Sequence, residues 1–198
     1  MTDPTGRPDA EPVPPPPGAD EPVGHSTDPE VHPAVEVPRP YTRETLESEE
    51  SQVKDGILRM GSLVAERIVA AIVALENHDA DAATWVIEND RDINQMEQEI
   101  SDLVTLTIAT QQPVARDLRF LLTLAQVAYD LERMGDYAGS VAKQARKLAP
   151  KAPVPPQDRL PELGRLVVQQ VRDILTVVVE VDEQRAREIA AKDDRVDE

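Results

Sequence analysis

The chain of 198 residues contains no cysteine, one tryptophan, one phenylalanine and eight glycines. Without cysteine it can form no disulfide, no thiolate metal site and no thiol nucleophile. The glycines stand singly, so the sequence holds no glycine-rich loop that could cradle a phosphate. His78 is the one histidine outside the amino-terminal tail, and no motif around it suggests a base for a serine nucleophile. These absences point away from an enzyme.

Basic residues are also scarce, with 21 Lys and Arg against 38 Asp and Glu, a formal net charge of -17. This excludes nucleic acid as a partner, because phosphate backbones require clustered Lys and Arg, and it favours partners with cationic surfaces. The first twelve residues lack the basic and apolar regions of a signal peptide. The most apolar run, Val64 to Leu75, is interrupted by Glu66 and Arg67 and is too short to span a bilayer. We therefore expect a cytoplasmic protein with no membrane insertion.

Residues 1–43 form a segment that is rich in proline and acidic residues, typified by PVPPPPG at 12–18. Such a composition cannot bury enough apolar surface to offset the entropy lost on ordering, so this segment is predicted to be a disordered tail. His25 and His32 lie in it without a third metal ligand in register.

Residues 44–149 show helical periodicity almost throughout. A first helix of about thirty residues is predicted by the spacing of its apolar positions. These positions are Ile57, Met60, Val64, Ile68, Ala71, Ile72 and Leu75. The polar residues 77–79 interrupt the pattern, and Asp79 is a suitable N-cap for the next helix.

A second helix is predicted from about Asp81 to Thr110, and Pro113 is well placed as the first residue of a third helix. The third helix has an unbroken 3-4 apolar repeat, which predicts close packing at its small residues. This repeat is Leu121, Leu124, Ala128, Leu131, Gly135, Ala138, Ala142 and Ala145. Because strand signals are essentially absent, we predict an all-α fold in which 44–149 is an antiparallel, up-down three-helix bundle.

After a proline-rich linker at 150–160, residues 161–198 repeat the first unit at an offset of 103 residues. Gly61 and Asp79, for example, correspond to Gly164 and Asp182, and the apolar positions also match. This indicates tandem bundles from a duplication. The second copy stops at the equivalent of Gln95, so its bundle is incomplete. We expect the chain to be a fragment, or its uncovered apolar faces to be covered by another chain.

Two groups of carboxylates could carry chemistry. Glu132 and Asp136 lie one helical turn apart on the third helix. The second helix carries a polar row at Asp90, Asn94, Glu97 and Ser101. If the two helices pack antiparallel, both groups border one groove, where hard divalent or trivalent cations could bind. Alternatively, they are solvated flanks of the bundle or partners for Arg and Lys.

Other candidate residues have simpler interpretations. Trp85 lies next to the apolar row of the second helix and is expected in the core or at an interface. Arg116 and Arg119 flank Asp117 and are expected to form local ion pairs. A buried di-iron site would need Glu-x-x-His pairs, which the bundle lacks.

Four segments together resemble the PhoU family of phosphate-signalling regulators. They are LRMGSLV at 58–64, the pattern Asp79…Ala83…Asp90…Asn94…Glu97, QQPVARDLR at 111–119 and DLERMGDYA at 130–138. The resemblance covers about residues 45–198, one complete unit and roughly half of a second. It implies an all-α protein made of two tandem three-helix bundles, which agrees with the observed offset.

The resemblance further implies a non-enzymatic regulator that dampens the phosphate-starvation response. Such proteins link a phosphate ABC transporter to a sensor histidine kinase, often as homodimers. Some bind iron, zinc or other metals such as manganese or magnesium through E/D-x-x-x-D motifs, and no organic cofactor is implied. That motif falls on Glu132 and Asp136, with Asp90, Asn94 and Glu97 in the facing row. The second unit lacks its own E-x-x-x-D helix. A metal-dependent helical-bundle enzyme and a purely structural helical module are the alternative functions.

Overall fold

The structure, a computed structural model, describes residues 42–151 and 159–191, and these residues form six helices joined by short connectors. The helices are α1 (Arg43–Glu76), α2 (Ala80–Glu88), α3 (Arg91–Gln111), α4 (Ala115–Leu148), α5 (Arg159–Glu180) and α6 (Glu183–Ala190). The prediction of an all-α fold is confirmed. Residues 1–41 of the predicted tail, most of the linker at 150–160 and the last seven residues lie outside the described part, while Thr42 caps α1 and Arg43 begins it.

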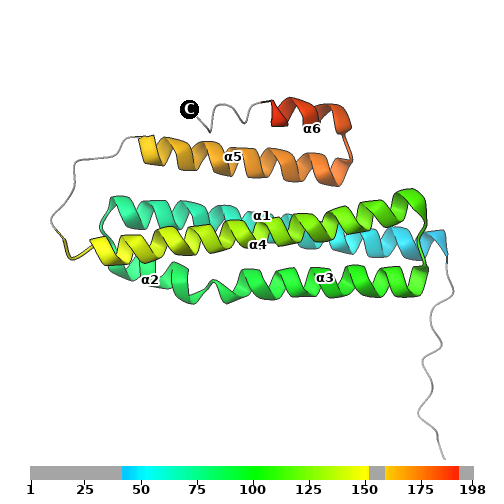
Figure 1. Cartoon of the computed structure of the whole chain (residues 1–198), viewed down its shortest axis with the longest axis horizontal. Helices are drawn as coiled ribbons and strands as arrows, with labels where there is room; N and C mark the ends of the chain where they lie inside the picture. The colour runs from blue at the N-terminus through cyan, green and yellow to red at the C-terminus, as the bar shows by residue number, and fades with distance from the viewer. Residues whose placement is uncertain (1–41, 152–158, 192–198) are drawn as a thin grey trace, which may run out of the picture. The chain divides into compact units, whose positions relative to one another are not determined.

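Helices α1, α3 and α4 form the bundle predicted for the first unit. Helix α2 packs on α1 and α4 at the end of the bundle where α1 finishes (Figure 1). The long helix α4 lies against both α1 and α3 and so provides the centre of the core. All eight positions of its predicted apolar repeat are buried. The first four pack against buried residues of α1 that include Val53, Ile57, Met60 and Val64, and the last three alanines pack near Ala71 and Ala74.

The predicted second helix is wrong in one respect, because a turn at Asn89 and Asp90 divides it into α2 and α3. The side-chain amide of Asn89 donates to the carbonyl of Trp85 at 2.8 Å. The amide of Ile93 donates to the carbonyl of Asp90 at 3.1 Å, a contact between residues three apart. The side chain of Asn89 thus bonds to a backbone carbonyl of the preceding helical turn, which is how asparagine competes with helix formation. The apolar periodicity continues across the turn, which is why the sequence pattern does not reveal it.

The position of Pro113 also differs from the prediction. It lies in the connector between α3 and α4, and α4 begins two residues later at Ala115 with Val114 as its N-cap. Gln112, the residue before the proline, adopts a left-handed conformation with φ of 47°. A proline disfavours the right-handed helical region for the residue that precedes it, so α3 ends at Gln111.

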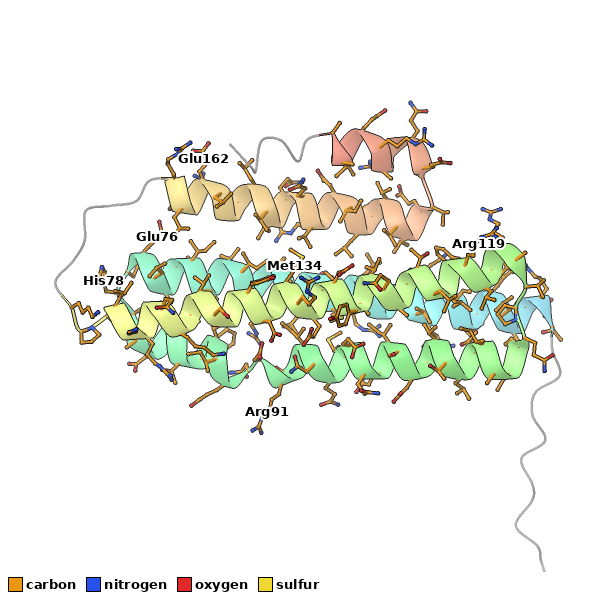
Figure 2. The ribbon with its side chains drawn as sticks, viewed as in Figure 1. Glu76, His78, Arg91, Arg119, Met134 and Glu162 are labelled. Carbon is orange, nitrogen blue, oxygen red and sulfur yellow. The ribbon has the colours of Figure 1, made fainter. Side chains whose placement is uncertain are left out.

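The connectors of the two units have the same geometry at the predicted offset. His78 and Val181 both have positive φ values, 52° and 57°. Asp79 and Asp182 follow them, and both side chains cap the next helix by accepting backbone N–H groups. His78 lies at the end of the bundle where α1 passes into α2 (Figure 2). A β-carbon disfavours positive φ, so its recurrence at equivalent residues supports a duplicated unit.

Helices α1 and α5 contact each other through reciprocal glycine positions. A Cβ at Gly61 would lie 2.0 Å from Cδ1 of Leu175, and a Cβ at Gly164 would lie 2.0 Å from Cδ1 of Ile72. Gly61 and Gly164 are equivalent residues of the two units, and so are Ile72 and Leu175. The interface between α1 and α5 is therefore pseudo-twofold, and each glycine receives a large side chain of the other helix.

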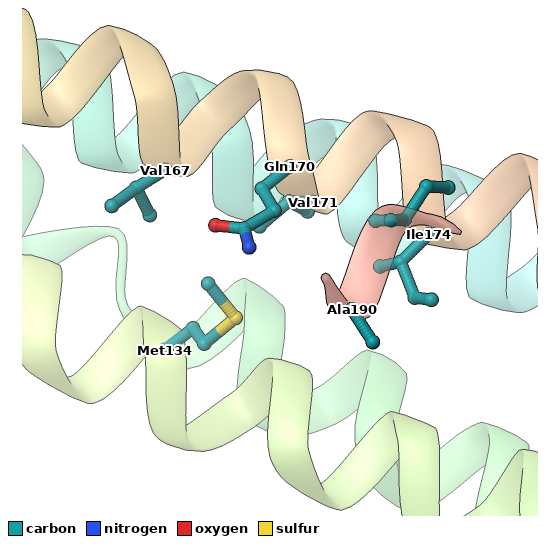
Figure 3. A pocket seen from close by; sticks show the side chains of 7 residues that line it. Met134, Val167, Gln170, Val171, Ile174 and Ala190 are labelled. Atoms are coloured by element: carbon teal, nitrogen blue, oxygen red, sulfur yellow. The ribbon is translucent and has the colours of Figure 1, made fainter. Parts of the chain in front are cut away.

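The second unit buries its apolar stripe less completely than the first. Met60 of α1 is fully buried, whereas its equivalent in α5, Leu163, is 39% exposed. A cavity of about 320 Å³ lies beside α5, lined mainly by apolar side chains (Figure 3). Its walls come from Met134 of α4, from one face of α5 including Val167 and Ile174, and from Ile189 of α6. None of the helices in the described ranges combines the length and apolar character required to cross a membrane.

Replacement of Gly61 by alanine should destabilise the fold. The new methyl group would force Leu175 from its buried position or separate α1 from α5, at a cost of about 1–3 kcal/mol. This cost should exceed the gain of about 1 kcal/mol that alanine brings to a helix interior. The measurement is the free energy of unfolding in urea.

Gly139→Ala is the matched control, because a Cβ at Gly139 would meet its nearest neighbour, Oδ1 of Asp90, at an ordinary 3.8 Å. This variant should be as stable as the wild type or more stable. Equal free energies of unfolding for the two variants would contradict the proposed role of Gly61.

Candidate functional site

The predicted acidic residues of α3 and α4 border one edge of the contact between these helices. A Cβ at Gly135 would lie 2.9 Å from Cδ1 of Ile93, so the missing side chain allows α3 to approach α4 closely. One turn further, the carboxylate of Asp90 lies over Gly139, with Oδ1 3.8 Å from the position of a Cβ. The absence of a side chain at Gly135 thus brings the start of α3 against the surface of α4.

Four carboxylates at this edge interact electrostatically, and we call them the acidic rim: Asp90, Glu97, Glu132 and Asp136. Burial raises the pKa of Glu132, and the negative charges of Asp136, Glu97 and Asp90 raise it further. Burial and the charge of Asp136 likewise raise the pKa of Asp90. The rim therefore holds more negative charge than its surroundings balance.

The residues of the rim differ in exposure. Asp90, Glu97 and Glu132 are half-buried, whereas Asp136 is exposed. Asn94, which sequence analysis placed in the same row, is also exposed. Arg91, immediately after the turn, points away from the bundle (Figure 2). The turn at Asn89 and Asp90 thus separates an inward acidic side chain from an outward basic one.

Arg67 of α1 is a part of this region that sequence analysis did not identify. It is only 4% exposed, and its guanidinium lies 3.4 Å from Oδ2 of Asp92. The guanidinium also stacks on Trp85, 4.2 Å from the ring centroid. Its positive charge lowers the pKa of Asp90, which partly opposes the repulsion from Asp136.

Trp85 was expected in the core or at an interface, and of these the core is excluded, because its side chain is 44% exposed. The indole covers the buried guanidinium of Arg67, a cation–π contact that stabilises the charge away from water. The burial of Arg67 could have been recognised from its position in the sequence, because it lies between Val64 and Ala71 on the buried face of an apolar helix. A charged residue at such a position requires partners, and Trp85 and Asp92 provide them.

The rim has the ligand types of a metal site but not the close spacing of its ligands. Carboxylate oxygens are suitable ligands for hard cations, and their mutual repulsion would be relieved by one. In the part of the chain that the structure describes, however, no three carboxylate or imidazole side chains lie close enough to hold a single ion. The predicted metal site at Glu132, Asp136, Asp90, Asn94 and Glu97 therefore stays a prediction.

The helices and the repeated connector define an all-α bundle protein with a duplicated helical unit. A protein-family model described as the PhoU domain matches residues 57–145. A PhoU homolog of Clostridium acetobutylicum, named as an accessory protein of the phosphate-specific transport system, is 35% identical over 79% of this chain and 72% of its own length. The accessory protein PhoU of Escherichia coli is 32% identical over 76% of this chain and 63% of its own length.

Solved structures agree with these relationships. The crystal structure of PhoU from Pseudomonas aeruginosa superposes with a TM-score of 0.72 at 33% identity, covering 77% of this chain and 73% of the other. That of the phosphate transport system regulatory protein PhoU from Streptococcus pneumoniae gives a TM-score of 0.71 at 30% identity, covering 77% and 72%. The chain belongs to the PhoU family.

The names of these relatives are those of accessory and regulatory proteins, which agrees with the prediction of a non-enzymatic protein. The chain spans less than two thirds of some relatives, for example 59% of a PhoU homolog from Xylella fastidiosa. The function of the full-length relatives is therefore assigned to this chain only as a proposal.

Because burial and repulsion disfavour its ionised form, Glu132 has a higher pKa in the folded chain than in the unfolded chain. The native state thus binds more protons in the interval between these two pKa values, and stability falls as pH rises through it. Glu132→Gln should therefore raise stability at pH 7 by a few tenths to about 1 kcal/mol. The gain should disappear below the ordinary pKa of 4.5, where the carboxyl is protonated in both states.

Thermal unfolding of both proteins between pH 3.5 and pH 8 measures this difference. Glu99→Gln, on the exposed side of α3, gives the effect of removing one negative charge away from the rim. A gain for Glu132→Gln that is independent of pH would show that repulsion at the rim is not its cause.

Proposed function

We propose that this protein regulates phosphate uptake and phosphate-starvation signalling as a non-enzymatic adaptor. In this proposal it works in the cytoplasm, between a phosphate ABC transporter and a sensor histidine kinase, and it dampens the starvation response. The observation that carries the proposal is the match to an accessory protein of the phosphate-specific transport system over 76% of this chain. The catalytic motifs that an enzyme would need were not found in the sequence.

The outer face of α4 offers a surface suited to protein partners. Tyr129 and Tyr137 are 52% and 63% exposed, and Leu122 on the same helix is 53% exposed. Arg133 lies between the two tyrosines, and its interaction with Tyr137 and Tyr129 raises its pKa. Tyrosine and arginine are enriched among the residues that dominate binding energy at interfaces. We therefore place the adaptor's contact on this face.

Affinity capture from membranes of the producing cell tests the adaptor function. The full chain, carrying an affinity tag, should retain subunits of the phosphate transporter and the sensor kinase, identified by mass spectrometry. Tyr129→Ala combined with Tyr137→Ala should reduce this capture at least tenfold, because two interface tyrosines of this kind contribute more than 1.4 kcal/mol.

Leu106→Ala is the matched control, because Leu106 is 59% exposed on a different helix, α3. It should leave the capture unchanged. Retention of neither transporter nor kinase by the wild-type chain would overturn the adaptor proposal, and equal capture by the tyrosine variant would move the contact to another face.

We also propose that the chain forms a homodimer. The incomplete burial of the stripe on α5, where Leu163 is 39% exposed, supports an association through apolar surface. Sedimentation velocity of the full chain would show a species of twice the chain mass.

A second candidate function is the binding of a divalent or trivalent metal ion, such as iron, zinc, manganese or magnesium, at the acidic rim. The raised pKa values of Glu132 and Asp90 favour it, because they reflect negative charge that a cation would compensate. Glu132→Ala combined with Asp136→Ala should lower the bound metal found by elemental analysis to background. Glu99→Ala combined with Asp102→Ala, on the exposed side of α3, should leave it unchanged. Equal metal contents in both variants would remove the rim from consideration.

A further inference from the structure

The other end of the first unit contains a buried polar layer that the proposed function does not use. There the beginning of α1, the end of α3 and the beginning of α4 lie together (Figure 1). The buried seam of α3 is apolar at Ile93, Ile100 and Val104 but becomes polar in its last two turns. Thr107 is fully buried and Gln111 is 2% exposed. Polar residues at such positions require partners.

The partners found in the structure are incomplete. Gln111 donates its side-chain N–H to Oε1 of Glu49 on α1, at 3.2 Å. The amide oxygen of Gln111, Oε2 of Glu49 and the hydroxyl of Thr107 are all buried, and none has a hydrogen-bond partner among the described residues. Gln111 and Thr107 are one turn apart, so they face the same side of α3. Exchanging the nitrogen and oxygen of Gln111 would set two oxygens against each other, so the assignment stands.

Two nearby basic side chains, Arg43 and Lys54, have partners outside this layer. Arg43 pairs with Glu47 at 2.7 Å and with Asp117 at 2.8 Å, which replaces the local pairs expected for Asp117 with Arg116 and Arg119. Lys54 lies 4.9 Å above the ring of Phe120. The last turn of α3 contains no basic residue to balance the negative end of its dipole.

Glu50 adds a further carboxylate with an unpaired buried oxygen to this end of α1. Its pKa is raised by burial and by the charge of Asp117, while Lys54 and Arg43 lower it. Glu50 therefore adds negative charge next to the unpaired oxygens of the layer.

We propose that this layer binds one hard cation of the calcium or magnesium type, with Glu49, Gln111 and Thr107 as its oxygen ligands. A carboxylate, an amide oxygen and a hydroxyl are the mixture of ligands that such ions accept. A water molecule would donate to the two atoms that only accept, in Glu49 and Gln111, and would accept from the Thr107 hydroxyl, so a response that depends on added cation distinguishes the two occupants. The layer is separate from the acidic rim, since Glu97 and Gln111 are about 20 Å apart along α3.

The test uses the full chain after treatment with a chelator. The rim is first removed by Glu132→Ala and Asp136→Ala, so that ions bound there do not contribute. Titration with calcium chloride, followed by calorimetry and thermal unfolding, should show one saturable site and a rise in Tm. Calcium is the first probe, because its coordination is flexible, and magnesium chloride is the comparison.

Thr107→Val keeps the shape of the buried side chain and removes one ligand, so it should weaken binding about tenfold or more. Gln111→Leu should abolish the rise in Tm, and it should also lower the stability of the ion-free chain, because Oε1 of Glu49 loses its hydrogen bond. Thr105→Val is the matched control: it is the same change at an exposed position of α3, and it should bind like the parent.

Absence of a calcium- or magnesium-dependent shift in the parent would overturn the proposal. An equal shift in Thr107→Val and the parent would do the same and would leave the layer as a polar network of the core. Thr107→Val decides the matter if Gln111→Leu does not fold. These outcomes do not affect the adaptor function, which is tested by capture of transporter and kinase.

Discussion

The arrangement of the helices depends on close approach at glycines. Gly61 and Gly164 each receive a large aliphatic side chain of the opposite helix, so α1 and α5 interlock along a pseudo-twofold axis. Gly135 does the same for Ile93 between α3 and α4. Each pocket is closed on one side by backbone, and dense packing leaves little room for even one extra methyl group. The contact at Gly135 fixes which face of α4 lies against α3.

The acidic rim is a consequence of this packing combined with the turn at Asn89 and Asp90. The turn places Asp90 at the N-cap position of α3. Its carboxylate makes no capping hydrogen bond there and lies over Gly139. Arg67 is buried next to it and is shielded by Trp85. The close contact at Gly135 thus sets the position of the rim, and the positive charges of Lys143 and Arg67 partly balance its negative charge. A continuous helix through residues 80–111 would have had no such turn to place Asp90.

Much of this fold could be predicted from sequence, because it follows from local patterns. The apolar repeat of α4, the cap at Asp79 and the offset between the units are visible in the residues themselves. The turn at Asn89, the burial of Arg67 and the polar layer at Gln111 were missed. Each depends on which helix lies opposite. An apolar repeat continues through a turn that keeps its register, so the repeat does not reveal the turn. A charged residue is expected at the surface from sequence unless its buried partner is known. Pro113 was misplaced because a proline that ends one helix need not begin the next.

Comparison of the two units separates what serves the fold from what serves the site. The capping aspartates, the positive-φ residues and the interlocking glycines recur at equivalent positions. The charged partners do not: the equivalents of Arg67 and Trp85 are Gln170 and Glu188. Backbone geometry was therefore retained after duplication, because both units need the same connector and the same close contact. The buried guanidinium beside an acidic surface belongs to the first unit, and it accompanies the carboxylates of α3 and α4 rather than the bundle as such.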